Sequence, residues 1–263
     1  MTIHPTAIIE DGAKIGSGVS IGPYSIIGKH VELGDDVQID SHVVVTGQTS
    51  IGARTQIFPF ASIGHIPQDL KFQGEDTRLE IGTDNRIREY VTMNPGTENG
   101  GGVTKIGDHG LFMAGTHIAH DCLVGDHVIL ANNATIAGHV VVGDYAIFGG
   151  MAAIHQFCHV GAHAFLGGGS IVVEDVIPYG TVSGNRAILS GLNLVGLKRR
   201  GFDRSHIHAL RGFYKTVFET ANDTNLEARI ALGEAEYGGT PLVDELVRFL
   251  RNGSGRGFCL DKS

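Results

Sequence analysis

The stretch from Ile15 to Asp40 reads IGSGVS-IGPYSI-IGKHVE-LGDDVQ-ID, and a large apolar residue opens every group of six. Glycine often follows it, and a small residue or valine stands four places after it, as at Val19 and Ser25. A period of six matches neither the helical repeat nor the alternation of a long strand. It indicates short strands separated by tight corners.

The same spacing of large apolar residues continues along most of the chain. It runs from Ile3 to Ile63, returns from Ile81 to Met93, and restarts one residue out of phase from Ile106 to Val172. Three groups of six make one triangular coil, and successive coils stack at about 4.8 Å as neighbouring strands do. We therefore predict a parallel β-helix; the period leaves its hand open, although crossover geometry in general favours a right-handed one.

Two segments interrupt the repeat. Residues 65–78 are expected to replace most of one coil, and residues 94–103 cause the phase slip. Both are long enough for functional loops rather than simple connectors.

The repeat stops near residue 186, and helical patterns follow. Ile207, Leu210 and Tyr214 have helical spacing. Thr224 with Glu227 predicts the start of another helix, Thr240-Pro241 starts a third, and a short helix is expected over residues 191–200. We thus expect a mainly β protein in two parts, a β-helix over 1–186 and an α-helical domain over 187–263 that covers the open end.

Composition narrows the class of protein. The 39 glycines suit the repeat, while the three cysteines form no CxxC pair and fit a reducing compartment. No apolar run is long enough for a membrane span, and the N-terminus lacks a signal peptide, so we expect a cytoplasmic protein. A net charge of -8 argues against general nucleic-acid binding.

A histidine beside a carboxylate marks the first candidate site. His120 precedes Asp121, and His139 should lie about one strand spacing above His120, with His155 near one further coil. An imidazole suits general-base chemistry, the carboxylate would stabilise the imidazolium, and the Gly138 amide could face a developing oxyanion. Zinc is a weaker alternative because a tight histidine pair at ligand spacing is missing, and Cys122 should point into the core as inert packing.

A basic block marks the second candidate site. Lys198, Arg199 and Arg200 open a segment that is strongly positive against an acidic background. Arginine forks bind phosphates and carboxylates, which favours a phosphate-bearing ligand or an acidic protein partner over a merely solvated helix face.

Several motifs together resemble the UDP-N-acetylglucosamine O-acyltransferases of lipid A synthesis, a hexapeptide-repeat acyltransferase family. They are PQDLKF at 67–72, HIAHDC at 117–122, LANNA at 130–134, AGH at 137–139, HQF at 155–157 and GLKRRGF at 196–202. The resemblance implies a left-handed β-helix, and a homotrimer with active sites between subunits. It implies transfer of an (R)-3-hydroxyacyl group from acyl carrier protein to the 3-hydroxyl of UDP-GlcNAc or a close analogue, without a cofactor, a metal or a covalent intermediate.

The resemblance also implies roles for individual residues. His120 would be the general base, Asp121 would orient it, and the Gly138 amide would stabilise the oxyanion. Substrates would be bound by the remaining site residues, with Gly168 at the floor of the acyl pocket: Asp69, Lys71, His117, His139, Gln156, Asn193, Arg199 and Arg200.

Other readings stay open at this point. They are a zinc carbonic anhydrase on the same solenoid, an acetyl-CoA-dependent O-acetyltransferase, and a purely structural solenoid. The sequence leaves open the preferred acyl length and whether the acceptor is UDP-GlcNAc or a 3-amino analogue.

Overall fold

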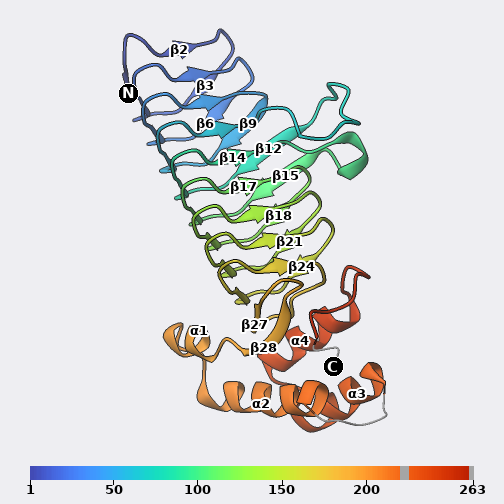
Figure 1. Ribbon diagram of the computed structural model, residues 1–263. Coiled ribbons are helices and arrows are strands. Elements are labelled where there is room, and N and C mark those ends of the chain that lie inside the picture. The colour runs from blue at the N-terminus through green and yellow to red at the C-terminus, as the bar shows by residue number, and fades with distance from the viewer. Residues whose placement is uncertain (220–224, 261–263) are drawn as a thin grey trace.

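The structure, a computed structural model, describes residues 1–219 and 225–260. The chain folds as a left-handed parallel β-helix with α-helices at its C-terminal end, as the repeat and the family resemblance predicted (Figure 1). The right-handed coil that crossover geometry favours in general is therefore wrong for this chain.

The strands of the described residues form three sheets, which are the three walls of the tube. The first sheet contains β1 (Thr2–Ile3), β4 (Ser20–Ile21), β7 (Gln38–Ile39), β10 (Gln56–Ile57), β13 (Arg86–Ile87), β16 (Leu111–Phe112), β19 (Ile129–Leu130), β22 (Ile147–Phe148), β25 (Phe165–Leu166), β27 (Gly180–Ser183) and β28 (Ile188–Leu192). The second contains β2 (Ile8–Ile9), β5 (Ile26–Ile27), β8 (Val44–Val45), β11 (Ser62–Ile63), β14 (Thr92–Met93), β17 (His117–Ile118), β20 (Thr135–Ile136), β23 (Ala153–Ile154) and β26 (Ile171–Val172). The third contains β3 (Lys14–Ile15), β6 (Glu32–Leu33), β9 (Gln48–Ile51), β12 (Arg78–Ile81), β15 (Val103–Ile106), β18 (Leu123–Val124), β21 (Val141–Val142) and β24 (His159–Val160).

The apolar residues of the repeat stack into one continuous core. Ile27 pairs in register with Val45, and Ile118 with Ile136, and all four are buried. Burial of each such side chain contributes about 2 kcal/mol. The repeat thus fixes both the inward face and the register of the coils.

The first interruption differs in one respect from its prediction. Ile81 pairs directly with Ile51, so residues 64–77 are inserted at a corner and no coil is lost. The second interruption, which contains the 3₁₀ turn η1 (Glu98–Gly100), is also a corner insertion, because Met93 pairs with Ile118 across it.

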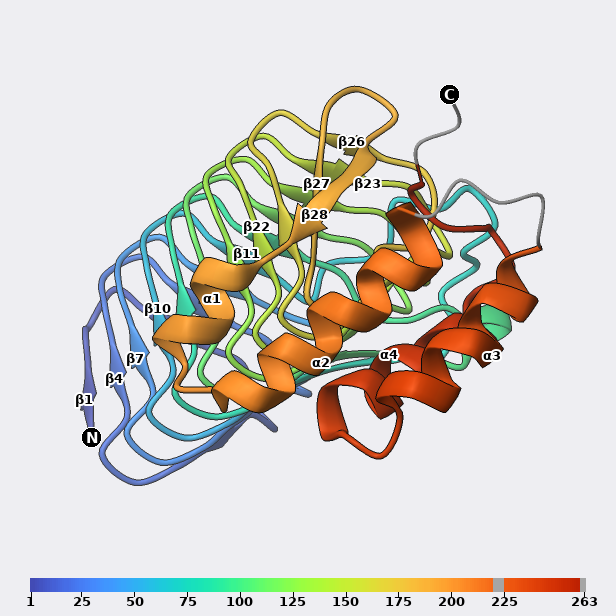
Figure 2. The same cartoon turned by 90° about the horizontal axis from the view of Figure 1, so that it is seen from below.

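The helices gather at one end of the tube, where β27 and β28 form an antiparallel hairpin (Figures 1 and 2). They are α1 (Leu194–Arg199), α2 (Arg204–Tyr214) with a π-helical continuation (Lys215–Glu219), α3 (Leu226–Tyr237) and α4 (Pro241–Arg251). Their core includes Ile177 and Tyr179 of the last coil, and the Tyr179 hydroxyl is hydrogen-bonded to Glu245 of α4. The predicted cap Thr224 lies outside the described residues; Asn225 caps α3 by accepting a hydrogen bond from the Ala228 amide.

Candidate active site

Both interruptions leave the tube at the same place. Each joins the second sheet to the third, and His120 and His139 occupy later corners of the same edge. We call this edge, with residues 64–77, 94–102, His120, Asp121, His139 and Phe157, the loop edge. In Figure 1 the two loops project from it side by side. The sequence predicted the loops and the histidines separately, and the fold brings them to one edge.

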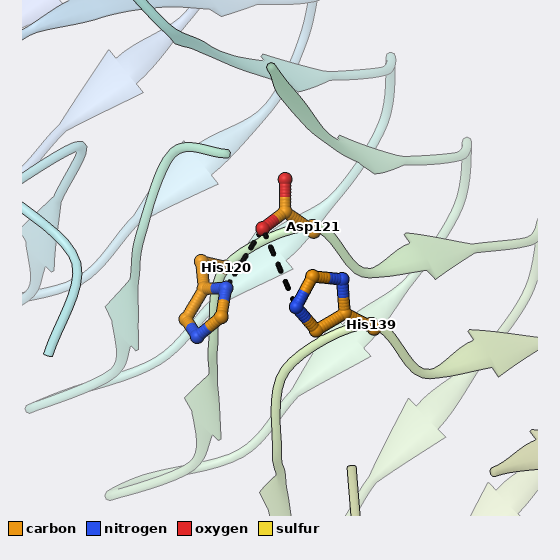
Figure 3. A group of neighbouring side chains, drawn as sticks. All are labelled: His120, Asp121 and His139. Carbon is orange, nitrogen blue, oxygen red and sulfur yellow. Dashed lines mark hydrogen bonds and ion pairs between the residues drawn. The ribbon is translucent and has the colours of Figure 1, made fainter. Parts of the chain in front are cut away.

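The central pair is His120 and Asp121. The Nδ1 atom of His120 lies 2.8 Å from Oδ2 of Asp121, and only 14% of the His120 side chain is exposed. Asp121 lies at the corner in a left-handed backbone conformation, φ 59°, which aspartate tolerates. Figure 3 shows the second ring nitrogen of His120 on the side away from Asp121. A bond of this kind leaves that nitrogen available for a substrate.

The Asp121 carboxylate is completely buried, with 0% of its side chain exposed. Thr97, in the loop that contains η1, donates its amide to Oδ1 at 2.8 Å and its hydroxyl to Oδ2 at 2.6 Å. The Asp121 amide in turn donates to the hydroxyl oxygen of Thr104 at 2.7 Å. Sequence reasoning missed Thr97, although the phase slip pointed to its loop.

Two further histidines flank the pair. His139 presents Nε2 to Asp121 Oδ2 at 3.9 Å, and its ring meets the His120 ring edge-on at 5.0 Å between centroids. Burial lowers the pKa of His139, opposed by the charge of Asp121. His117 Nδ1 lies 2.7 Å from the Thr92 hydroxyl, and burial followed by the charge of His120 lowers its pKa. Both imidazoles are therefore favoured in the neutral form, which suits hydrogen bonding to a substrate.

The row of rings that begins with His120 and His139 continues with another residue than the predicted His155. Phe157, not His155, stacks on His139, with ring centroids 4.4 Å apart. The side chains of His155 and Gln156 are exposed, and His155 Nδ1 lies 3.2 Å from the Gln156 carbonyl. On successive coils this edge therefore carries two histidines and a phenylalanine, and not three histidines.

Gly138 faces His120 from the next coil. A β-carbon on Gly138 would lie 2.7 Å from His120 Cε1, so the imidazole fills the space that a side chain would need. Within residues 1–219 and 225–260 the Gly138 amide donates to no acceptor.

The loop over residues 64–77 carries Asp69 and Lys71. The Lys71 amide donates to Asp69 Oδ1 at 3.0 Å, and the charge of Asp69 acts on His139 in the direction that raises its pKa. Asn94 of the other loop donates to the carbonyls of His65 and Ile66 at 3.0 and 3.4 Å. The two loops are thereby joined at their base.

The basic block lies at a different edge. The corners between the third and first sheets stack His109, His127, Tyr145, His163 and Tyr179, which we call the aromatic edge. Arg200 packs over the Tyr145 ring at 4.7 Å and donates to the Tyr145 carbonyl at 3.3 Å. Asn193 caps α1 and donates to the His163 carbonyl at 3.0 Å.

A cavity of about 570 Å³ adjoins this block and is lined by Asn193, Val195, Arg199 and Arg200 together with Ile147 and Phe165. Within one chain the structure therefore places the predicted substrate-binding residues Asn193 and Arg200 at the aromatic edge and His120 at the loop edge. Gly168 lies at a corner of the remaining edge, where a β-carbon would first meet the Gly150 carbonyl oxygen, at 3.4 Å.

The structure corrects one argument against a metal site. Ligand-capable atoms of His120, Asp121 and His139 lie within 4.8 Å of one another, so the expectation that no close histidine pair exists is wrong (Figure 3). Asp121 Oδ2 nevertheless already accepts hydrogen bonds from His120 and Thr97, and a metal that bound this oxygen would have to displace them. Cys122 is buried, and burial raises the pKa of its thiol to about 12, which confirms inert packing.

The described helices give no candidate for a membrane crossing, since none is both long and apolar enough.

Two family models match the chain. Residues 175–259 match the second domain of UDP N-acetylglucosamine O-acyltransferase, and residues 12–47 and 104–138 match the bacterial transferase hexapeptide repeat. These segments include the helical end and both coils of His120 and Gly138.

Whole-chain similarity points the same way. The acyl-[acyl-carrier-protein]--UDP-N-acetylglucosamine O-acyltransferase of Rickettsia bellii is 52% identical over 98% of this chain and 91% of its own length. The protein of the same name from Paracoccus denitrificans is 54% identical over 77% of this chain and 76% of its own length. The crystal structure of UDP-N-acetylglucosamine O-acyltransferase from Moraxella catarrhalis superposes with a TM-score of 0.95 at 42% identity, covering 98% of this chain and 100% of that one. The chain is therefore an acyltransferase and belongs to the family of acyl-[acyl-carrier-protein]--UDP-N-acetylglucosamine O-acyltransferases.

Proposed function

We propose that this enzyme transfers an (R)-3-hydroxyacyl group from acyl carrier protein to the 3-hydroxyl of UDP-GlcNAc, the first step of lipid A biosynthesis. Similarity to enzymes named for this reaction supports the substrates. The single observation that carries the mechanism is the hydrogen bond between His120 Nδ1 and the buried Asp121 carboxylate, because it leaves His120 Nε2 as a base.

The reaction follows from this arrangement. His120 Nε2 removes the proton of the sugar hydroxyl while its oxygen attacks the thioester carbonyl. Asp121 stabilises the imidazolium that forms, as in other histidine–carboxylate pairs. The C–S bond then breaks, and the proton on His120 passes to the departing thiolate, so no covalent enzyme intermediate is required.

The Gly138 amide is the proposed donor to the oxyanion of the tetrahedral intermediate. The Gly138 backbone lies beside the base, and its amide donates to no acceptor among the described residues. A backbone donor fixed by the coil needs no reorganisation as the charge develops, which is why such donors contribute strongly to acyl transfer.

The acceptor sugar is assigned to the loop edge. His117 and His139 flank the base there, and favoured neutral imidazoles suit hydrogen bonds to sugar hydroxyls. Asp69 and Lys71 are assigned to the sugar or its phosphates, because their loop leaves the tube at the same edge as His120 and His139.

The pantetheine arm is assigned to Arg199 of the basic block, and Gly168 forms the floor of the acyl pocket. The nucleotide is assigned to Asn193 and Arg200 at the aromatic edge, together with Gln156, which precedes Phe157 of the loop edge. Because His120 and Arg200 occupy different edges of one chain, the complete site combines the loop edge of one protomer with the basic block of another. A head-to-tail contact of this kind closes into a ring, which fits the homotrimer with sites between subunits that the family resemblance implies.

The carrier protein is assigned to the helical end. A groove of about 500 Å³ between α1 and α2 is lined by Lys198, Arg204, His208 and Arg211, beside Phe202 and Ile207. A basic surface of this kind is complementary to an acidic partner. Because its substrates are a carrier protein and a nucleotide sugar, we assign the enzyme to the cytoplasm.

Product mass spectrometry tests the reaction. The enzyme is incubated with UDP-GlcNAc and a series of hydroxyacyl carrier proteins, with acetyl-CoA and hydroxyacyl-CoA as alternative donors. We expect a mono-acylated UDP-GlcNAc that forms from carrier-bound donors, with one preferred chain length. Acylation from acetyl-CoA alone, or carbon dioxide hydration without acyl transfer, would overturn the assignment.

A further inference from the structure

Thr97 holds the carboxylate on which the proposed base depends. It supplies two of the hydrogen bonds to Asp121, at 2.8 Å to Oδ1 and 2.6 Å to Oδ2, and His120 Nδ1 lies 2.8 Å from the same Oδ2. A carboxylate without solvent contact needs such donors to satisfy its oxygens. Thr97 reaches it from 24 residues away in the chain.

The loop of Thr97 also closes over the carboxylate. The amides of Gly100 and Gly102 donate to the Thr97 carbonyl at 3.0 and 2.9 Å, which folds η1 back on itself. A β-carbon on Gly100 would lie 2.0 Å from Asp121 Cγ. Only a glycine therefore allows the backbone to lie directly against the carboxylate and keep water from it.

We propose that Thr97 is a positioning residue for acyl transfer, which fixes the Asp121 carboxylate so that its Oδ2 atom holds the Nδ1 proton of His120. The inference rests on the proposed function, because it takes His120 as the base. With Oδ2 fixed, the neutral imidazole carries its proton on Nδ1 and leaves Nε2 without one. The phase slip in the repeat thus supplies the residues that set the tautomer of His120.

The test compares variants of the full-length trimer. Thr97→Val removes the hydroxyl with little change of shape, and Thr97→Ser keeps it. The control is Thr116→Val, because Thr116 is buried and its hydroxyl has no partner among the described residues. We expect Thr97→Val to lower kcat by about ten- to a hundredfold with little change in KM, the effect of losing a hydrogen bond to a charged group. Thr97→Ser and Thr116→Val should keep kcat within about threefold of the natural chain.

The ¹⁵N NMR spectrum of the His120 ring gives a readout independent of activity. The natural chain, Thr97→Ser and Thr116→Val should show the proton on Nδ1, and Thr97→Val should show both tautomers. If Thr97→Val fails to assemble, Thr97→Ala takes its place, because it also removes the hydroxyl and keeps the backbone amide. Gly100→Ala is expected to disturb the same signal, since it pushes against the carboxylate.

His120→Ala, measured in parallel, separates the two proposals. If His120→Ala is inactive while Thr97→Val keeps the natural kcat and tautomer, Thr97 has no positioning role and the proposed function stands. If His120→Ala still turns over, the proposed mechanism is wrong, whereas the ¹⁵N signal of Thr97→Val still shows whether Thr97 fixes the imidazole.

Discussion

The backbone of Gly138 lies against the imidazole of His120, so that a β-carbon at Gly138 would approach His120 Cε1 to 2.7 Å and Nε2 to 2.8 Å. The proposed base nitrogen and the proposed oxyanion donor are thus neighbours on successive coils. A hydroxyl that reaches Nε2 is therefore also close to the Gly138 backbone, to which the oxyanion is assigned. This proximity is what a direct attack on a thioester requires.

Gly138→Ala should displace the His120 ring and lower kcat/KM by about a hundredfold or more. The loss would be steric rather than backbone strain, because Gly138 does not have the positive φ that alanine avoids. Ser41→Ala is the matched control, since Ser41 occupies the same corner position before a positive-φ residue, His42. A Gly138→Ala enzyme with normal kinetics would show that the ring and the backbone are not held in contact.

Chelation should leave turnover intact. His120, Asp121 and His139 are close enough to hold a metal, but Asp121 Oδ2 already accepts hydrogen bonds from His120 and Thr97. We expect metal analysis of the purified enzyme to give far less than one zinc per chain, and dialysis against a strong chelator to preserve kcat. Stoichiometric zinc whose removal abolishes turnover would favour metal chemistry instead.

Stability should fall in mild acid because of His163. Burial, and then the charge of Arg200, lowers the pKa of His163 to about 4, below the ordinary histidine value of 6.5. As the pH drops below 6.5, His163 binds a proton in the unfolded chain, whereas in the folded chain it binds one only near pH 4. The free energy of unfolding therefore decreases as the pH falls from 6.5 to about 4. Between pH 7.5 and 5 the expected loss is about 2 kcal/mol per chain.

His163→Phe should remove this part of the acid sensitivity. Phenylalanine keeps the stacking with Tyr145 and Tyr179, and Phe60 and Phe157 already adopt the same positive φ at other corners. Urea unfolding at a fixed protein concentration, at both pH values, measures the difference in the free energy of unfolding. Equal acid sensitivity in the two proteins would show that His163 titrates normally in the folded chain.

Mixed trimers should reveal a site shared between protomers. His120→Ala and Arg200→Ala are each expected to be inactive or nearly so. If one protomer supplies His120 and its neighbour supplies Arg200, equal mixing of the two during refolding restores about a quarter of the sites. A site within one chain would gain nothing from mixing.

The repeat allowed most of the fold to be predicted, because a large apolar residue every six positions leaves few other ways to bury a core. The in-register pairs Ile27–Val45 and Ile118–Ile136 are direct consequences. Residues 65–78 were predicted to replace most of a coil, because in the sequence an insertion at a corner interrupts the repeat in the same way as a missing coil does. The pairing of Ile81 with Ile51 distinguishes them.

Site residues could be predicted where they occupy equivalent corners of successive coils, and not elsewhere. His120 and His139 followed from their spacing, whereas Phe157 was overlooked although it stands one coil after His139. Thr97 could not be predicted, since its contact with Asp121 depends on the path of an irregular loop. The separation of Arg200 from His120 likewise required the edges to be assigned in space.

The most direct test of the account is the turnover of His120→Ala with UDP-GlcNAc and a hydroxyacyl carrier protein, measured on protein whose assembled mass and melting temperature match those of the natural enzyme. The account predicts that kcat falls by about a hundred- to ten-thousandfold, the contribution of a general base. Turnover within a few-fold of the natural enzyme would contradict it.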